Sequence, residues 1–230
     1  MNQRRLARLI LIRHAEPDAS VHGRCYGSLD VGLSAAGREQ AAAVAAGLAA
    51  ADLGAVYASP LLRARETAAA IAARHGLPVL IDHGLRELDF GDCEGRSYEE
   101  IAATMPDLYA RWMSEPTTVE FPGGESFDAL RARATAAAAR IHGDLIGRTA
   151  AAVTHGGVCR ALLADVFDLP TELIFRFDIS YARATVIDWY DDEPTVRLVN
   201  GRANDLPPHG VAAFSSDVTT RFVPFPGALG

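Results

Sequence analysis

The sequence predicts an α/β fold: a mainly parallel central sheet with helices on both faces and an inserted helical lid. Short aliphatic runs alternate with longer helical stretches, which is the pattern of parallel strands joined by helices. Two of the aliphatic runs end in a histidine, and a segment rich in aromatic residues and proline interrupts the alternation at 86–127. We therefore expect one α/β domain over residues 1–200, with the lid at about 86–127, followed by an irregular C-terminal tail at 201–230.

The first half of the chain is predicted to alternate between strand and helix. The elements expected there are a strand at 9–12, a helix at 34–51, a strand at 55–58, a helix at 61–74 and a strand at 78–81. The continuous aliphatic run at the first of these suits a strand buried on both faces. Ser34 can cap the first helix, which Gly54 closes. Pro60 opens the second helix and Gly76 ends it.

The second half continues the pattern after the lid. The elements expected there are a strand at 150–154, a helix at 158–167 and two late strands at 183–190 and 195–200. Gly156 and Gly157 lead into the helix, and a turn at 191–194 separates the late strands. The tail is expected to be irregular because it is rich in proline, glycine and serine.

The composition excludes several function classes. The chain carries 22 basic and 29 acidic residues, a net charge of −7, which argues against nucleic acid or an anionic membrane as the main partner. All the basic residues are arginine, so there is no lysine for a Walker A loop, a kinase strand or a Schiff base. The Gly-x-Gly, Gly-x-Ser-x-Gly and His-Glu-x-x-His patterns are absent as well.

Cysteine use and hydropathy bear on the compartment. Cys25, Cys93 and Cys159 are odd in number and widely spaced, which indicates structural thiols in a reducing compartment. The aliphatic run at 9–12 is too short for a signal peptide, and the apolar stretch at 41–51 is too short to span a bilayer. We expect a soluble, cytoplasmic protein with no membrane partner.

Two histidines at strand ends are the sharpest candidates for chemistry. His14 follows Arg13 at the end of the first strand, and His155 follows the strand at 150–154. A single histidine in such a place is more often a packed or capping side chain. If both strands are central and parallel, however, the two imidazoles share one pocket with the guanidiniums of Arg13 and Arg63. Two arginines and two histidines without a cluster of metal ligands favour a phosphate dianion as the ligand.

These residues lie in five motifs that occur in one order along the chain. The motifs are Leu-Ile-Arg-His-Ala-Glu-Pro from 11, Ala-Ser-Pro-Leu-Leu-Arg-Ala from 58, Leu-Arg-Glu-Leu-Asp-Phe-Gly from 85, Phe-Pro-Gly-Gly-Glu-Ser from 121 and Val-Thr-His-Gly-Gly-Val from 153. Together they resemble the histidine phosphatase superfamily, also called phosphoglycerate mutase-like, over about residues 9–200.

The resemblance implies a role for each candidate. His14 would attack phosphorus and form a phosphohistidine, while Arg13, Arg63 and His155 would hold the nonbridging oxygens. Glu87 would act as general acid and base, although a salt bridge to Arg86 or another arginine is the alternative for its carboxylate. Further candidate positions for binding phosphate or substrate are Ser28 and Gly156. The resemblance implies neither a metal nor a cofactor.

Details of the motifs favour the phosphatase branch. The chain reads Arg-His-Ala from Arg13 where the family usually has Arg-His-Gly, and the segment at 87–95 resembles phosphatases more than mutases. The stretches at 23–27 and 158–163 are similar to α-ribazole phosphatases. We thus expect a metal-independent hydrolase of a small phosphorylated metabolite, with α-ribazole 5′-phosphate as one candidate.

Three other functions compete with this expectation. A phosphoglycerate mutase would use the same His14, but the segment at 88–95 argues against it. A protein phosphohistidine phosphatase would have little use for the insertion at 86–127. A non-catalytic phosphate-binding domain would not need Glu87. The sequence is also compatible with a homodimer.

Overall fold

The computed structural model describes residues 6–208 except 146 and 191–192. The strands are β1 Leu6–Arg13, β2 Leu53–Ala58, β3 Val79–Ile81, β4 Thr149–Thr154, β5 Ala184–Tyr190 and β6 Glu193–Gly201. The helices are α1 Ala35–Gly47, α2 Leu62–His75, α3 Tyr98–Thr104, α4 Pro106–Ser114, α5 Phe127–Asp144 and α6 Gly156–Val166. Every strand expected from the sequence is present.

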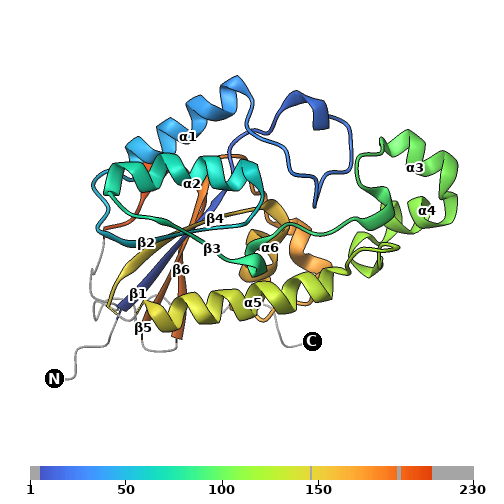
Figure 1. The fold of residues 1–230 in the computed structure, drawn as a ribbon. Helices are drawn as coiled ribbons and strands as arrows, with labels where there is room; N and C mark the ends of the chain where they lie inside the picture. Colours follow the sequence, from blue (N-terminus) through green and yellow to red (C-terminus); the bar gives the residue numbers. More distant parts are fainter. Residues whose placement is uncertain (1–5, 146, 191–192, 209–230) are drawn as a thin grey trace, which may run out of the picture.

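The six strands form one sheet in the order β3-β2-β4-β1-β5-β6 (Figure 1). The pairs β3–β2, β2–β4 and β4–β1 are parallel, whereas β5 and β6 join the sheet antiparallel. The mainly parallel sheet is therefore confirmed, with an antiparallel edge. Because Arg13 pairs with Thr154 and Ala58 with Val153, the carboxyl ends of β1, β4 and β2 lie side by side.

Helices cover both faces of the sheet, as expected (Figure 1). The side chains of β1 alternate between the faces, since successive residues of a strand point in opposite directions. Ile10 and Ile12 pack with residues of α1 and α2, while Leu9 and Leu11 pack with residues of α5 and α6. The central strand is thus buried on both sides, which explains its continuous aliphatic sequence.

Two helix boundaries differ from the prediction. Ser34 caps α1 by accepting a hydrogen bond from the Gly37 N–H, but the helix ends at Gly47, not Ala51. The chain tightens after Gly47 into turns with three-residue hydrogen bonds, such as Ala51 N–H to Leu48 O. Gly54 lies inside β2, beside an irregularity in the β2–β4 register, and so does not close the helix.

At two other helices, one glycine lies where the sequence predicts it and two do not. Gly76 ends α2 with a left-handed φ of 64°, as the sequence predicts. Gly156 and Gly157, expected to precede a helix at 158–167, form the first turn of α6 instead. A side chain at 157 would displace the Glu87 carboxylate, because a Cβ there would lie 2.3 Å from the Glu87 Oε1 atom.

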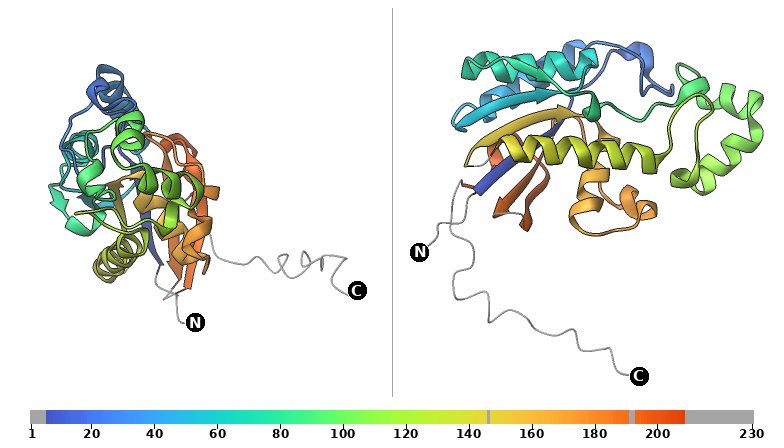
Figure 2. Two further views of the ribbon diagram at one scale, coloured as in Figure 1. Left: turned by 90° about the vertical axis from the view of Figure 1, so that its right-hand side faces the viewer. Right: turned by 60° about the horizontal axis from the view of Figure 1, so that its bottom comes forward.

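The segment expected to form a lid contains the two short helices α3 and α4, which lie at one end of the molecule (Figure 2). Ser97 and Glu100 form a capping box at the start of α3. Trp112 of α4 packs against Phe90 and Phe121, with ring centroids 5.6 and 5.0 Å away. The long helix α5, capped by Ser126, follows the lid and was not predicted.

The last described residues return to the sheet. Ala203 is buried against the α1 side of the core, and the carbonyls of Pro207 and Pro208 accept hydrogen bonds from the Arg8 guanidinium. The tail expected from residue 201 therefore has an ordered first part, and residues 209–230 lie outside the described residues. Of the predicted turn at 191–194, Glu193 and Pro194 belong to β6, while 191–192 lie outside the described residues. No helix in the described part of the chain is both long and apolar enough to cross a membrane.

Candidate active site

The parallel strands β1 and β4 bring the two predicted histidines together. His14 directly follows β1, and its backbone N–H donates a hydrogen bond to the carbonyl of Thr154, the last residue of β4. His155 follows Thr154 and is the N-cap residue of α6. The two imidazole centroids are 5.0 Å apart, and both side chains are buried.

His14 has one ring nitrogen free to act as a nucleophile. Its Nδ1 atom lies 2.7 Å from the Ala15 carbonyl oxygen, which can only accept, so Nδ1 carries the proton. Burial, Arg63 and Arg13 hold the pKa of His14 well below its usual range, against a smaller opposing effect of that carbonyl. The imidazole is therefore neutral near pH 7, with an unprotonated Nε2.

Arg63 is fully buried at the start of α2, and its guanidinium is fixed by a neighbouring loop. Its two terminal nitrogens each donate a hydrogen bond of 2.7 Å, one to the Leu29 carbonyl and one to the Gly27 carbonyl. Burial lowers the pKa of Arg63, and Glu87 opposes that effect. The guanidinium stays charged at any relevant pH.

Glu94 holds the loop that positions Arg63. Its carboxylate accepts hydrogen bonds from the backbone N–H groups of Gly27, Ser28 and Leu29, and of Phe90 as well. No side chain fits at position 27, because a Cβ would lie 1.7 Å from the Leu88 carbonyl oxygen. The loop is thus anchored from both sides.

Arg13 and His155 complete the cationic side of the site. Arg13 donates a 2.6 Å hydrogen bond to the Ile179 carbonyl and lies 3.9 Å from the ring centroid of Tyr181. His155 Nε2 lies 2.8 Å from Ser59 Oγ. Burial, followed by the charges of Arg63, His14, Arg13 and Arg133, lowers the pKa of His155 well below its usual range.

Three buried nitrogens of this cluster have no hydrogen-bond partner among the described residues. They are Arg13 Nε, Arg63 Nε and His155 Nδ1. A buried donor without a partner costs roughly 1–3 kcal/mol, so three of them in one cluster indicate a site that a ligand rich in acceptors completes. If the Ser59 hydroxyl donates to Nε2 of His155, the ring proton lies on Nδ1 and this atom is also a donor.

Glu87 lies between this cluster and a cavity of about 400 Å³. Its carboxylate accepts hydrogen bonds from the backbone N–H groups of Leu88 and Gly157, at 2.9 and 3.1 Å. Its own carbonyl oxygen accepts one from Arg133. Within the described residues Glu87 forms no ion pair, so the alternative salt bridge to Arg86 is not found. The carboxylate is held in place without being neutralised.

The two remaining candidates differ in their surroundings. Ser28 is exposed, and its described contact is the backbone hydrogen bond to Glu94 rather than one made by its hydroxyl. Gly156 is in the cluster: a Cβ there would lie 3.6 Å from Arg13 Cζ and 3.0 Å from an Arg160 terminal nitrogen. A glycine lets both guanidiniums approach the start of α6.

The side chains that form the wall of the cavity beside Glu87 were not predicted from the sequence. Arg160 lines this cavity, although the sequence showed it only as part of a motif. Six aromatic or apolar side chains also line it. The sequence placed them in the lid or gave them no role: Phe90, Tyr98, Trp112, Met113, Phe127 and Phe175. Their spacing in the sequence follows no helical or strand period, so no pattern could have grouped them.

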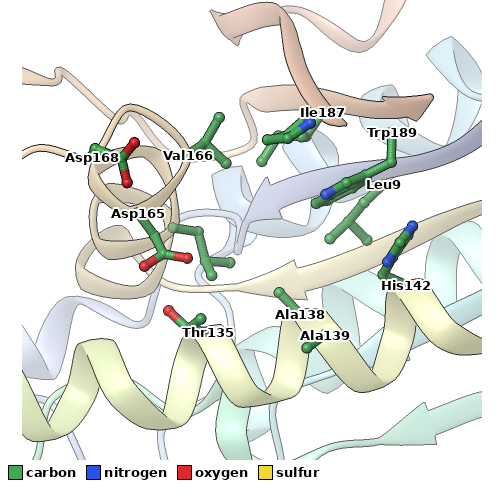
Figure 3. Close-up of a pocket in the computed structure, with 12 residues that line it drawn as sticks. Leu9, Thr135, Ala138, Ala139, His142, Asp165, Val166, Asp168, Ile187 and Trp189 are labelled. Carbon is green, nitrogen blue, oxygen red and sulfur yellow. The ribbon is translucent and has the colours of Figure 1, made fainter. Parts of the chain in front are cut away.

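Figure 3 shows a second cavity, of about 370 Å³, which neither His14 nor His155 lines. Side chains of α5, α6 and β5 line it, among them His142 and Trp189, whose rings stack with centroids 5.0 Å apart. None of the candidate catalytic residues borders this cavity. The chemistry therefore concentrates at the carboxyl ends of β1 and β4.

The fold and the site together define a class: an α/β protein with two buried histidines and two arginines gathered at the carboxyl ends of parallel strands. The family model of the histidine phosphatase superfamily (branch 1) matches residues 9–202. The chain belongs to this superfamily and is a hydrolase of the phosphatase type. The resemblance seen in the sequence motifs is confirmed.

Relatives and solved structures agree with this membership. Phosphoglycerate mutase-like protein 4 of Arabidopsis thaliana is 43% identical over 68% of this chain and 69% of its own length. Phosphoserine phosphatase 1 of Hydrogenobacter thermophilus is 32% identical over 85% of this chain and 92% of its own length. The alpha-ribazole phosphatase structure from Shigella flexneri superposes with a TM-score of 0.80 at 30% identity, covering 87% of this chain and all of that one. The chain spans about half the length of a similar bifunctional protein of Mycobacterium tuberculosis.

Proposed function

We propose that this protein hydrolyses small phosphomonoesters without a metal ion, by passing the phosphoryl group from the ester to Nε2 of His14 and then to water. The observation that carries the proposal is the set of buried donors without partners, Arg13 Nε, Arg63 Nε and His155 Nδ1, around a neutral His14. A phosphoryl group offers three nonbridging oxygens, which such donors suit.

In the first step the His14 Nε2 lone pair attacks phosphorus as the bond from phosphorus to the ester oxygen breaks. The cations Arg13 and Arg63, together with His155, stabilise the charge on the nonbridging oxygens. The carboxyl of Glu87 gives its proton to the departing oxygen, so that the alcohol leaves neutral. Nδ1 of His14 keeps its hydrogen bond to the Ala15 carbonyl, which orients the ring throughout.

In the second step a water molecule enters where the alcohol has left. Glu87, now a carboxylate, takes a proton from this water as the oxygen attacks phosphorus and the bond to Nε2 breaks. Inorganic phosphate forms, and His14 and Glu87 return to their starting protonation states. The hydrogen bonds from Leu88 and Gly157 hold the Glu87 side chain at the same position while it gives and then takes a proton.

The cavity beside Glu87 favours hydrolysis over a mutase reaction. A mutase must hold a second phosphate near the phosphohistidine, which requires further cations. Leu88 and Phe90 give the cavity an apolar wall, and Arg160 is the one basic residue among those that line it. The acidic Asp89 and Asp92 lie in the same segment. Water is therefore the acceptor that we propose.

The test is a rapid-quench experiment with a ³²P-labelled ester. The parent protein should form an acid-labile phosphoenzyme, and His14→Ala should neither form it nor turn over, because its side chain has no nucleophile. Exhaustive EDTA treatment should leave the parent rate unchanged. An acid-stable label, near-normal turnover of His14→Ala, or activity that returns only with added metal contradicts the mechanism. Build-up of 2-phosphoglycerate ahead of inorganic phosphate from 3-phosphoglycerate contradicts the hydrolase assignment.

A further inference from the structure

The cavity beside Glu87 has the position of a leaving-group pocket. Glu87 and Gly157 line it, so it begins where the proton donor of the proposed mechanism stands. Its volume of about 400 Å³ lies in the range of pockets that enclose a small molecule. The departing alcohol of any ester cleaved at His14 must lie on this side of Glu87. The shape and chemistry of the cavity then decide which alcohols fit.

Aromatic rings from two separate parts of the fold line this cavity. Phe90, Tyr98 and Trp112 belong to the lid segment, where the Trp112 centroid lies 5.6 Å from that of Phe90 and 5.5 Å from that of Tyr98. Phe127 and Phe175 follow the lid and pack edge to face at 5.5 Å. Tyr98 is 40% exposed and Phe175 48% exposed, an unusual exposure for such large apolar side chains. A flat apolar group would cover them.

Arg160 is the cation of this cavity. It projects from α6, and its Nε donates a 3.0 Å hydrogen bond to the Phe177 carbonyl while its guanidinium lies 5.6 Å from the Phe175 ring centroid. Among the described residues no carboxylate forms an ion pair with it. Its terminal nitrogens are therefore free to bind an anion. Arg13 and Arg63 do not line this cavity, although Arg13 and Arg160 both approach the start of α6 at Gly156.

We infer that Arg160 determines substrate specificity by binding an anionic group on the leaving alcohol. The preferred substrates are then phosphomonoesters whose alcohol joins a flat apolar ring to a carboxylate or a similar anion. Two chemistries in one pocket support this class: aromatic walls for the ring, and an unpaired guanidinium at the edge for the anion. The inference rests on the proposed phosphatase reaction at His14 and adds the chemical class of the leaving alcohol.

Matched aryl phosphates test it. Phenyl phosphate is compared with 3-carboxyphenyl and 4-carboxyphenyl phosphate, whose phenols have similar acidity, so that differences in kcat/KM report binding of the carboxylate. The parent should prefer at least one carboxylated ester by about 10- to 100-fold, the range of one hydrogen bond to a charged group. Arg160→Met should lose that preference through KM, with a much smaller loss of kcat/KM on phenyl phosphate than on the carboxylated ester. Arg160→Lys, which retains the charge, should keep part of the preference.

The outcomes separate the two proposals. Arg74→Met, which removes an exposed charge from α2, should behave like the parent on all three esters. If the parent shows no preference for a carboxylated ester, the anionic subsite is wrong while the phosphatase proposal stands. If Arg160→Met loses phenyl phosphate activity equally, Arg160 binds the phosphoryl group and the specificity inference is wrong. If the folded parent cleaves none of the three esters, the proposed reaction and this inference both fall.

Discussion

The carboxylate of Glu87 is held by two backbone N–H groups, from Leu88 and Gly157, and this determines what a substitution there does. Glu87→Gln keeps an acceptor oxygen for only one of these donors and cannot release a proton. We expect alkyl phosphates to be cleaved about 10²–10⁴ times more slowly, the usual contribution of a positioned acid. p-Nitrophenyl phosphate should lose less in the first step, because nitrophenolate leaves without a proton.

Single-turnover rates on the two esters check this expectation, since they isolate the first step. Equal losses on both esters would remove Glu87 from the role of acid. The substitution should leave the circular dichroism spectrum close to that of the parent, while the loss of one of the two backbone contacts lowers the melting temperature slightly.

The two buried histidines should make stability depend on pH. The pKa of His14 and that of His155 lie well below 6.5 in the folded state, chiefly through burial and the arginines. Below about pH 6.5 the unfolded chain takes up protons that the folded chain does not. The free energy of unfolding should therefore be highest above that pH and fall on acidification, by up to about 1.4 kcal/mol per pH unit for each histidine.

Urea unfolding at several values between about pH 7.5 and 5 measures this slope. His155→Gln should have a shallower slope than the parent, because one of the two histidines is gone. His83→Gln, which replaces an exposed histidine, serves as the control and should keep the parent slope. A parent slope that does not change in His155→Gln would contradict the low pKa of that residue.

The sequence predicted that the candidate histidines and arginines lie together, but it did not predict the side chains that surround them. His14, Arg13 and His155 could be placed because strand ends of a parallel sheet meet at one edge, and Arg63 because it begins the helix after β2. Arg160 could not be assigned, because an arginine on a helix is usually a solvated charge. Its place in the cavity depends on how the lid and the segment after α6 fold over it.

The loop at residues 27–29 forms one unit with Glu94 and Arg63. Glu94 accepts the backbone N–H groups of the loop, and the carbonyls of Gly27 and Leu29 accept from Arg63. Glu94→Gln removes the charge and one acceptor oxygen. Vanadate mimics the five-coordinate phosphoryl group. We expect its inhibition constant to rise by about tenfold or more, because Arg63 loses its fixed orientation.

Inhibition constants for vanadate, with KM and kcat measured separately, check this prediction. Glu99→Gln, on the exposed side of α3, is the matched control, and vanadate should inhibit it as strongly as the parent. If Glu94→Gln lowers the melting temperature but binds vanadate normally, then Glu94 stabilises the fold without positioning Arg63.

The elements were predictable where local signals agree with packing. Ser34 and Gly76 mark helix ends because their side-chain cap and left-handed backbone act locally. Gly54 misled the prediction, because a glycine in a strand looks like a helix stop. Helix α5 escaped it because alanine occurs on both its exposed and its buried face, as at Ala136 and Ala137, which weakens the contrast that marks the period.

Beyond the site, a buried ion pair joins the first strand, β1, to the late strand β5. Arg8 and Asp188 form two hydrogen bonds of 2.6 and 2.7 Å, with side chains only 4% and 1% exposed. Asp188→Asn leaves the buried guanidinium without its full partner. We expect the free energy of unfolding to fall by about 3–5 kcal/mol.

Chemical denaturation checks this value, and turnover per folded molecule should be unchanged because the pair lies outside the active site. Arg140→Gln breaks an exposed pair with Asp82, and it should cost about 1 kcal/mol or less. A loss for Asp188→Asn no larger than that control would show that the buried pair adds little.

The position of β1 also governs when this chain can fold during its synthesis. β1 is made first among the strands, yet its neighbours in the sheet are β4 and β5. Arg8 must wait until 180 further residues have been added before Asp188 exists to pair with it. At about 5–20 residues per second the ribosome needs roughly 10 to 40 s for that stretch. Until β4 has been made, the aliphatic edges of β1 have no partner strand, so a nascent chain depends on chaperones or on early collapse to keep Leu9 through Ile12 from aggregating.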